Sequence, residues 1–428
     1  MERLISVGGC FVLLGIAWLL SNNKRQINYR VVLWGLLLQL IFAVIILKTT
    51  PGQALFFYAK AAITKLLSFT DAGASFLFGS LYRGDPDIVK AIGGSGPYQI
   101  MDPGSGQFVN IGIIFAIHVL PTIIFFASLM SILYHLGIMQ KVVNAVAWVM
   151  AKFMGTSGAE SLSVASNIFV GQTEAPLVIR PFISGMTMSE LMAVMTGGFA
   201  TIAGGVMAAY VRFGANAGHL MAASVMSAPA AFVMAKIIFP ETGEPETKGN
   251  IKIPIEKTTT NVVDAAASGA ADGLKLALNV GAMLMAFIAL IAMIDFGLFK
   301  MGGLFGLADL SLKKILGYLF APLALVMGVE TGDALNFGYL LGTKISINEF
   351  VAFVQLGQWK DILSPRSFTI ATYALCGFAN FSSIAIQIGG IGGIAPDRKH
   401  DLAKIGLKAM IAGALASWLT ATIAGILI

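Results

Sequence analysis

Two glutamates lie in segments of the chain that are otherwise apolar. Glu174 is part of the run GQTEAPL at 171–177, and Glu349 is part of NEFVAF at 348–353. An ionised carboxylate deep in a bilayer costs about 2.5–3.5 kcal/mol even on lenient insertion scales, so such residues are functional by default. We therefore expect both to belong to a binding site. For Glu349 the alternatives are an ion pair with Lys344 or a place at the mouth of a hairpin.

The residues around Glu174 predict the tip of a hairpin. Gly171 permits a turn, Thr173 suits a helix cap, and Pro176 suits a first helical turn. Gln172, Thr173 and Glu174 would then lie at the tip, just before the second arm. The alternative is an ordinary membrane span with a polar kink, in which a lone polar residue only helps helices to pack.

The end of the first arm of this hairpin has the chemistry of a cation site. An arm that ends near Val170 leaves carbonyl oxygens without partners, and such a helix end attracts positive charge. Asn167 adds an amide oxygen one turn earlier, and Thr173 adds a hydroxyl. Oxygen ligands without a carboxylate-rich cage suit Na⁺ better than a divalent ion.

Neutral polar residues accompany the second glutamate. Asn380, Ser382 and Ser383 follow Glu349 in a later apolar segment. Amide and hydroxyl groups both donate and accept hydrogen bonds, and carboxylates accept them. Two carboxylates with such neighbours can bind a neutral solute that is rich in hydroxyl groups, and they would suit an anion poorly.

The composition indicates that lipid surrounds these segments. The chain has 428 residues, of which 57% are hydrophobic and only 12% charged, and its mean hydropathy is +0.82. Soluble domains carry about 25% charged residues. The formal charge is +6, but the positive residues lie in short loops between apolar runs. That pattern is typical of membrane topology signals and argues against a nucleic-acid partner.

Other chemistry is scarce in the sequence. Cys10 and Cys376 lie inside apolar runs, which argues against a disulfide framework or a cysteine metal site. The four histidines form no HExxH motif, and no phosphate-binding glycine loop is present. We therefore expect a protein that is not an enzyme, uses no cofactor other than a coupling ion, and is driven by an ion gradient. An intramembrane enzyme and a channel are the weaker alternatives.

Eight stretches have the length and apolar character of membrane spans. They are residues 4–21, 31–47, 111–133, 189–211, 220–238, 276–294, 368–388 and 405–428. Shorter amphipathic or interfacial helices are expected at 53–67, 139–154 and 261–272, with polar loops at 81–106 and 240–260. Basic residues cluster at 24–30 and 398–404, and placing both loops in the cytoplasm puts both termini outside it.

Two regions depart from the pattern of simple spans. Residues 158–183 and 312–356 have apolar arms that polar residues and glycines interrupt. Irregular backbone at membrane depth must be buried or line a cavity, which favours re-entrant hairpins. Similar segments follow them, GGFATIAGGV at 197–206 and CGFANFSSIAI at 376–386. A hairpin with an acidic residue, then a broken helix, occurs twice, as in transporters with inverted repeats and a site at the midplane.

The sequence resembles the concentrative nucleoside transporter family, in its bacterial, sodium-coupled branch. The resemblance rests on GQTEAPL at 171–177, NEFVAF at 348–353 and ALCGFANFSSI at 374–384, in that order. It implies an all-α polytopic membrane protein with about eight transmembrane helices, two re-entrant hairpins, and scaffold and transport domains that move as an elevator. It also implies a homotrimer in the inner membrane of a bacterium.

The resemblance assigns roles to individual residues. The substrate-binding residues it implies are Gln172, Thr173 and Glu174 toward the nucleobase, Val206 and Phe378 packing nearby, and Glu349, Asn380 and Ser383 toward the ribose. The sodium ligands it implies are Asn167, Val170, Thr173, Thr201 and Ile202, partly through backbone carbonyls. Some relatives have serine at the position of Thr201, which keeps the hydroxyl.

The expected division of the chain follows these elements. N-terminal spans occupy 1–50, and an interfacial helix, an extramembrane loop and scaffold helices occupy 51–155. The first hairpin and repeat of the transport domain occupy 156–240. A linker, an interfacial helix and a central scaffold helix occupy 241–300, and the second hairpin and repeat with the C-terminal helix occupy 301–428. The leading hypothesis is a Na⁺–nucleoside symporter, and the alternative is a proton-coupled carrier of nucleosides or another small polar solute.

Overall fold

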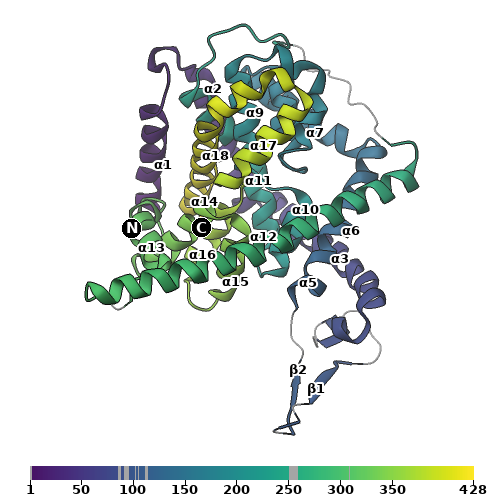
Figure 1. Cartoon of the computed structure of the whole chain (residues 1–428). Helices are drawn as coiled ribbons and strands as arrows, with labels where there is room; N and C mark the ends of the chain where they lie inside the picture. Colours follow the sequence, from purple (N-terminus) through teal and green to yellow (C-terminus); the bar gives the residue numbers. More distant parts are fainter. Residues whose placement is uncertain are drawn as a thin grey trace.

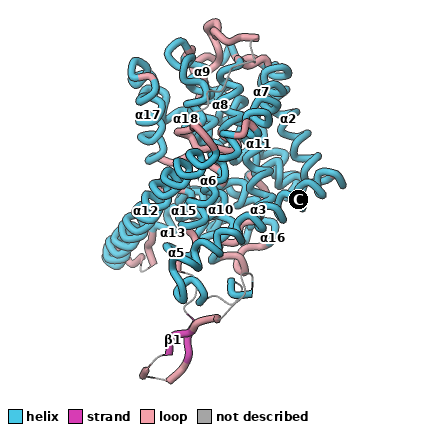
Figure 2. The backbone as a smooth tube through the Cα atoms, turned by 90° about the vertical axis from the view of Figure 1, so that its right-hand side faces the viewer, coloured by secondary structure: helices cyan, strands magenta, loops and turns pink. Residues whose placement is uncertain are grey.

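The chain is almost entirely helical in the computed structural model, which describes residues 2–84, 88–90, 96–101, 103–104, 106–110, 114–249, 259–307 and 309–428. A two-stranded antiparallel hairpin, β1 (Gln99–Met101) with β2 (Phe108–Asn110), projects from one end of the helical body (Figures 1 and 2). The first strand lies in the polar loop predicted at 81–106 and the second just after it, and part of that loop falls outside the described residues. The fold class predicted from the sequence is confirmed.

Seven helices or helix pairs in the described part of the chain are long and apolar enough to cross a membrane. They are α1 (Glu2–Leu19), α2 (Tyr29–Lys48), α5 with α6 (Phe115–His118, Leu120–His135), α9 with α10 (Met188–Ala200, Gly204–Arg212), α11 (Ala217–Ile238), α12 (Val262–Leu304) and α18 (Lys399–Leu427). The eighth predicted span, at 368–388, consists of two shorter helices, α16 (Pro365–Leu375) and α17 (Phe381–Ile394).

Further helical elements connect these helices. They are η1 (Lys24–Gln26), α3 (Thr50–Phe78), η2 (Gly79–Gly84), α7 (Ile138–Met154), α13 (Leu312–Val326), η4 (Thr331–Asp333) and η5 (Pro396–Arg398). The predicted short helices at 53–67 and 139–154 correspond to α3 and α7, although α3 is longer than expected. Asp333, at the end of η4, accepts a hydrogen bond from the Ser364 amide over 3.1 Å.

One prediction was wrong about helix continuity. The expected interfacial helix at 261–272 and the expected span at 276–294 are one unbroken helix, α12 (Figure 1). Its first turns lie on α6 because Gly269 and Gly273, one turn apart, let the two backbones approach. A Cβ added at Gly273 would lie 2.8 Å from the Ile124 Cα, and one at Gly269 would lie 2.8 Å from the Ala127 carbonyl oxygen.

The internal repeat is present in the structure. The first copy runs from α8 (Gly158–Ser166) through η3 (Ala175–Gly185) to α9, α10 and α11. The second runs from α14 (Ala334–Ser346) through α15 (Glu349–Gln358) to α16, α17 and α18. Each copy is therefore a hairpin, a broken helix and a continuous helix. The second arm of the first hairpin is a 3₁₀ helix, and Thr173 does not cap it, since Glu174 holds that position without a capping bond.

The two broken helices meet at their breaks. Gly377 has φ +150°, a conformation that favours glycine, and a Cβ there would lie 2.7 Å from the Phe199 carbonyl oxygen. The Gly204 amide at the start of α10 donates to the Phe169 carbonyl at the tip of the first hairpin over 3.0 Å. Irregular backbone from both repeats thus lies together in the interior, where other protein groups satisfy its polar atoms.

Burial divides the helices into two groups. The apolar windows of α11 and of the α9–α10 pair are each 89% buried inside the protein, whereas that of α12 is only 17% buried. Large apolar side chains such as Met285 and Phe296 of α12 are exposed. The repeats therefore form a packed body, and α12 presents an apolar surface to its surroundings.

Both ends of the chain lie at the same end of this body (Figure 1). The Arg3 side chain donates to the Ile428 carbonyl, and Ser6 donates to the Met327 carbonyl over 3.0 Å. Beyond the other end of α1, the Asn22 side chain accepts a hydrogen bond from Lys408 of α18. Helices α1 and α18 therefore lie alongside each other.

Candidate functional site

The second hairpin holds Glu349 in the interior. Asn348 caps α15 by accepting a hydrogen bond from the Val351 amide over 2.9 Å, which places Glu349 in the first helical turn. The Glu349 side chain is 3% exposed. Its Oε2 accepts from Asn380 Nδ2 over 2.8 Å, and its Oε1 accepts from the Tyr210 hydroxyl over 3.3 Å. The carboxylate is thus fixed by one group from each broken helix.

Asn380 connects Glu349 to the start of α17. Its Oδ1 accepts from the Ser383 amide over 2.8 Å and from the Ser382 hydroxyl over 2.7 Å, while its Nδ2 donates to Glu349. An asparagine at this position both caps the second half of the broken helix and presents its amide to the hairpin. The three residues predicted to face a ribose therefore lie together.

Gln172 of the first hairpin reaches the same helix. Its Nε2 donates to the Ser383 hydroxyl over 3.2 Å, and its Oε1 accepts from Gln387 Nε2 over 3.0 Å. Gln387 also donates to the Met195 carbonyl over 3.1 Å. A continuous polar chain consequently runs from Glu349 through Asn380 and Ser383 to Gln172, and it joins the two hairpins.

Glu174 differs from what the sequence suggested. The residue is exposed on the protein surface, unlike Glu349. It is on the side of the hairpin that faces α6 and α12, because it interacts electrostatically with Tyr134 and Asp272 of those helices. Thr173 is its hydrogen-bond partner, and the Thr173 methyl group faces Gly390 of α17. The exposed carboxylate therefore borders the boundary between the first hairpin and the α6–α12 pair.

The residues predicted to bind sodium lie around one turn of α9. Asn167 is the C-cap of α8, and its Nδ2 donates to the Ser163 carbonyl over 3.1 Å. Its Oδ1 is buried and has no hydrogen-bond partner among the residues that the structure describes. A Cβ added at Gly197 would lie 3.5 Å from Asn167 Nδ2, and the Thr201 hydroxyl donates to the Gly197 carbonyl over 2.9 Å. Asn167 and Thr201 therefore flank the same helical turn.

The unpartnered Asn167 oxygen fits a cation ligand. A buried polar atom without a partner carries a desolvation cost, so a bound ion would account for it. Val170 and Ile202 lie in the adjoining irregular backbone, where carbonyls are free of helical bonding, and Ile202 is fully buried. Among the described residues no group of three His, Cys, Asp or Glu side chains gathers. An ion here would rely on carbonyl, amide and hydroxyl oxygens, which suits Na⁺.

Apolar side chains complete the neighbourhood. Val206 and Tyr210 are one turn apart on α10, and Val206 is 1% exposed. Phe378 lies in the break between α16 and α17 and is 9% exposed. The Tyr210 ring stacks on Phe353 with centroids 4.0 Å apart and meets Phe350 edge-on at 5.0 Å. An apolar wall with a few directed polar groups is the usual construction of a small-molecule site.

A buried ion network fixes the base of the first hairpin. Lys236 of α11 pairs with Glu160 of α8 over 2.7 Å and with Glu241 over 3.5 Å. Ser157, which caps α8, donates to Glu190 Oε1 over 2.5 Å. Glu160 and Glu190 each complete a capping box at the start of their helix. The network therefore joins α8, α9 and α11 at the end away from the tip.

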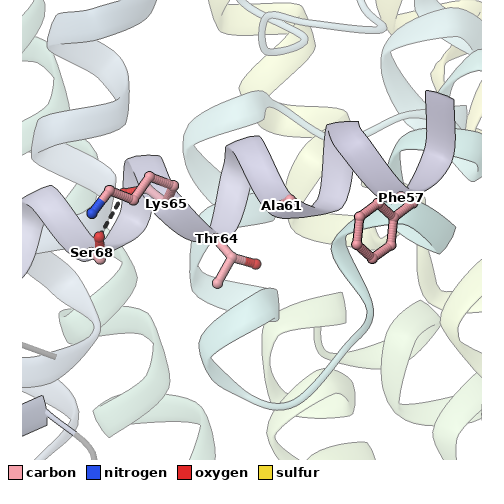
Figure 3. A pocket seen from close by; sticks show the side chains of 5 residues that line it. All are labelled: Phe57, Ala61, Thr64, Lys65 and Ser68. Atoms are coloured by element: carbon pink, nitrogen blue, oxygen red, sulfur yellow. Dashed lines mark hydrogen bonds between the residues drawn. The ribbon is translucent and has the colours of Figure 1, made fainter. Parts of the chain in front are cut away.

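The hollow in Figure 3 is unrelated to this site. Its lining comes from one face of α3, and no residue of either hairpin contributes to it. The lining residues are Phe57, Ala61, Thr64, Lys65 and Ser68. Because these side chains lie on an exposed helix surface, the hollow offers nothing like the directed hydrogen bonds around Glu349.

Several residues of the site were not identified from the sequence. Tyr210 and Gln387 were missed, although a lone glutamine in the apolar run FSSIAIQIGG is a visible signal. Lys344 was considered only as a partner for Glu349, and it instead donates to the Ala374 carbonyl over 2.8 Å. The capping boxes at 157–160 and 187–190 are also visible in the sequence, but the pairing of Glu160 with Lys236 depends on the fold.

Comparison with known proteins identifies the family. Profiles described as the N-terminus and C-terminus of Na⁺ dependent nucleoside transporters match residues 8–81 and 219–425, and one described as nucleoside recognition matches 116–217. An uncharacterized transporter of Haemophilus influenzae is 45% identical over all of this chain and 98% of its own length. The sodium/nucleoside cotransporter 1 of Mus musculus is 40% identical over all of this chain and 64% of its own length.

The chain belongs to the concentrative nucleoside transporter family. The structure of the family transporter CNTnw in an inward-facing substrate-bound state is 42% identical in sequence to this chain, with a TM-score of 0.89. The match covers 100% of this chain and 98% of the CNTnw chain. Variants of CNTnw in an outward-facing state and in an intermediate state match with TM-scores of 0.89 and 0.90. The resemblance drawn from the three sequence motifs is confirmed, and the family and fold are those of a nucleoside transporter rather than an enzyme.

Proposed function

We propose that this concentrative nucleoside transporter is a symporter that moves nucleosides into the cell with Na⁺. The observation that carries the proposal is the polar chain from Glu349 through Asn380 and Ser383 to Gln172. It offers acceptors and donors to a neutral, hydroxyl-rich solute. The unpartnered Asn167 oxygen lies in the hairpin that supplies Gln172, so ion and solute would share one structural unit.

The proposed roles follow the position of each side chain. Glu349, Asn380 and Ser383 would bind the ribose hydroxyls, because a buried carboxylate and its amide neighbour form strong directed hydrogen bonds. Gln172, Thr173 and Glu174 would bind the polar edge of the base, with Val206 and Phe378 against its faces. Sodium would bind at Asn167, Val170, Thr201 and Ile202. Thr173 is proposed for the substrate rather than for the ion, since it bonds to Glu174.

An elevator motion is the proposed mechanism of access. The repeats form a packed body, whereas α6 and α12 form a separate pair that is joined closely by Gly269 and Gly273. We propose the first as the transport domain, in the segments 156–240 and 301–428, and the second as part of the scaffold. Glu174 lies at the boundary between them, where a moving domain would carry bound substrate past the scaffold. CNTnw, with its different states, offers a precedent for such motion.

The proposed assembly is a homotrimer in the inner membrane of a bacterium, with both termini outside the cytoplasm. The exposed apolar face of α12 would supply contacts between protomers and with lipid. The mass of the purified protein after subtraction of bound detergent tests the assembly, and a monomeric mass would contradict it. Labelling of a single cysteine at Lys24→Cys by an impermeant maleimide, in inverted vesicles but not in intact spheroplasts, tests the orientation.

Uptake of radiolabelled uridine and adenosine by proteoliposomes tests the transport proposal. With potassium inside and sodium outside, accumulation should exceed that of liposomes without protein, and it should disappear when choline replaces sodium. A proton gradient is applied as a separate arm. Uptake that depends on the proton gradient and does not depend on sodium would favour the proton-coupled alternative over the sodium proposal. Absence of uptake in every arm would count against nucleoside transport itself.

A further inference from the structure

A lysine that forms no salt bridge within the described part of the chain lies at the centre of the second repeat. Lys344, in the last turn of α14, is fully buried. Its ammonium donates to the Ala374 carbonyl and to the Ser417 hydroxyl, each over 2.8 Å. Ser417 donates its own proton to the Ala414 carbonyl over 2.9 Å, so its oxygen accepts from the lysine. The ammonium is therefore held by oxygen atoms of neutral groups from α16 and α18.

Satisfying the Ala374 carbonyl does not by itself require a charge. Ala374 lies three residues before the Gly-Phe-Ala sequence of its broken helix, and Met195 lies three residues before Gly-Phe-Ala in the other repeat. The Met195 carbonyl accepts from the neutral amide of Gln387. An ammonium that leaves water for the protein interior loses its hydration, and this desolvation is unfavourable. The positive charge of Lys344 therefore calls for a role of its own.

The position of Lys344 corresponds to the proposed ion position in the first repeat. In that repeat Asn167 ends the first hairpin arm and faces the last turn of α9. In the second repeat Lys344 ends the first hairpin arm and faces the last turn of α16, where the helix stops and its carbonyls attract positive charge. In each repeat the end of the first hairpin arm thus contacts the last turn of the first half of the broken helix. The contact contains the unpartnered Asn167 oxygen in the first repeat and the Lys344 ammonium in the second.

We propose that the ammonium of Lys344 is the resident cation of the second repeat and fills the place that an exchangeable Na⁺ takes in the first. This inference rests on the sodium site proposed above. The proposal limits the number of sodium ions that are carried with each nucleoside, because only the first repeat retains a site for an ion that enters and leaves. The fixed charge of Lys344 also interacts favourably with the Glu349 carboxylate on the same hairpin. The negative charge in the proposed solute site is therefore compensated without a second sodium ion.

Two substitutions separate this role from simple packing. Lys344→Asn removes the ammonium and supplies an amide oxygen, as Asn167 does in the first repeat. Lys344→Met removes the ammonium, keeps an unbranched side chain, and supplies no oxygen. Proteoliposomes loaded with each variant are given ²²Na⁺ and tritiated uridine together. We expect Lys344→Asn to carry one more sodium ion per nucleoside than the wild type. A wild-type ratio in a transporting Lys344→Asn protein would overturn the proposal.

Thermal unfolding provides a readout that does not need transport. The midpoint of each purified protein is measured in sodium chloride and in choline chloride of equal concentration. A ligand that binds only the folded state raises this midpoint as its concentration increases. We expect a larger sodium-dependent rise in Lys344→Asn than in Lys344→Met, and equal rises would overturn the proposal. A wild-type midpoint that does not change with sodium would instead contradict the sodium site proposed in the first repeat. The comparison of the two variants would still test the proposal for the second repeat.

Discussion

The side-chain amide of Asn380 donates to the carboxylate of Glu349 over 2.8 Å, and this bond joins the second hairpin to the break in the helix that follows it. The same asparagine caps α17 through the Ser383 amide. The polar contact that positions the carboxylate is therefore the contact that starts the second half of the broken helix. The position of the Glu349 carboxylate and the start of α17 therefore depend on one side chain.

Glu349→Gln should weaken nucleoside binding while leaving the shape of the site almost unchanged. A hydrogen bond to a charged group contributes about 1.5–3 kcal/mol, so affinity should fall about tenfold to about 150-fold. Tyr210→Phe is the matched control, because it removes only the longer 3.3 Å bond to Glu349 and keeps the stacking on Phe353. Its loss should be about tenfold or less. The measurement is the dissociation constant for uridine, by calorimetry in sodium, and wild-type affinity in Glu349→Gln would remove that residue from the site.

Thr201→Val should weaken activation of transport by sodium. Valine keeps the shape of threonine and removes the hydroxyl proposed as a sodium ligand. Thr372→Val is the matched control, because Thr372 lies in the other broken helix and donates to the carbonyl four residues earlier, as Thr201 does. The sodium concentration for half-maximal uridine uptake should rise about tenfold in Thr201→Val, by the loss of about 1.4 kcal/mol of ligand interaction. Equal values for the two variants would show that the hydroxyl only stabilises its helix.

The sequence predicts which segments form the candidate site better than it predicts the hydrogen bonds between them. Glutamates in apolar segments and the repeated Gly-Phe-Ala motif placed both hairpins and both breaks, because buried charge and irregular backbone are costly in lipid and leave a visible pattern. The bond from Gln172 to Ser383 joins residues 211 positions apart, and no local pattern encodes it. Hydropathy also could not show that Glu174 is exposed, since that depends on how the hairpin faces α6 and α12.

Helix continuity was the other limit of the sequence argument. Residues 261–272 are rich in small side chains, which predicted a separate helix at the interface. In the fold, Gly269 and Gly273 bring α12 against α6, so the small residues mark a close helix contact. Composition gives the same signal for both arrangements. Only the packing partner distinguishes them.

Lys236→Met should destabilise the base of the first hairpin. It leaves Glu160 buried without its 2.7 Å partner, and breaking such a pair costs about 3–5 kcal/mol. The double variant Lys236→Met with Glu160→Gln should recover part of the loss, because the uncompensated charge is removed. Lys314→Met is the control, since its pair with Asp309 is exposed and worth about 1 kcal/mol or less. Thermal unfolding midpoints decide the matter: a double variant that melts no higher than Lys236→Met would show that charge pairing is not what Lys236 contributes.

Gly273→Leu should separate α12 from α6. An added Cβ would lie 2.8 Å from the Ile124 Cα, and a backbone atom cannot move aside as a flexible side chain can. Overpacking of this kind typically costs about 1–3 kcal/mol. Gly297→Leu is the matched control on the same helix, because a Cβ there has open space around it. If the pair forms the scaffold, Gly273→Leu should lower the unfolding midpoint and reduce the maximal uptake rate, while the Michaelis constant for uridine stays near that of the wild type. A changed Michaelis constant with an unchanged midpoint would place this contact in the binding site instead.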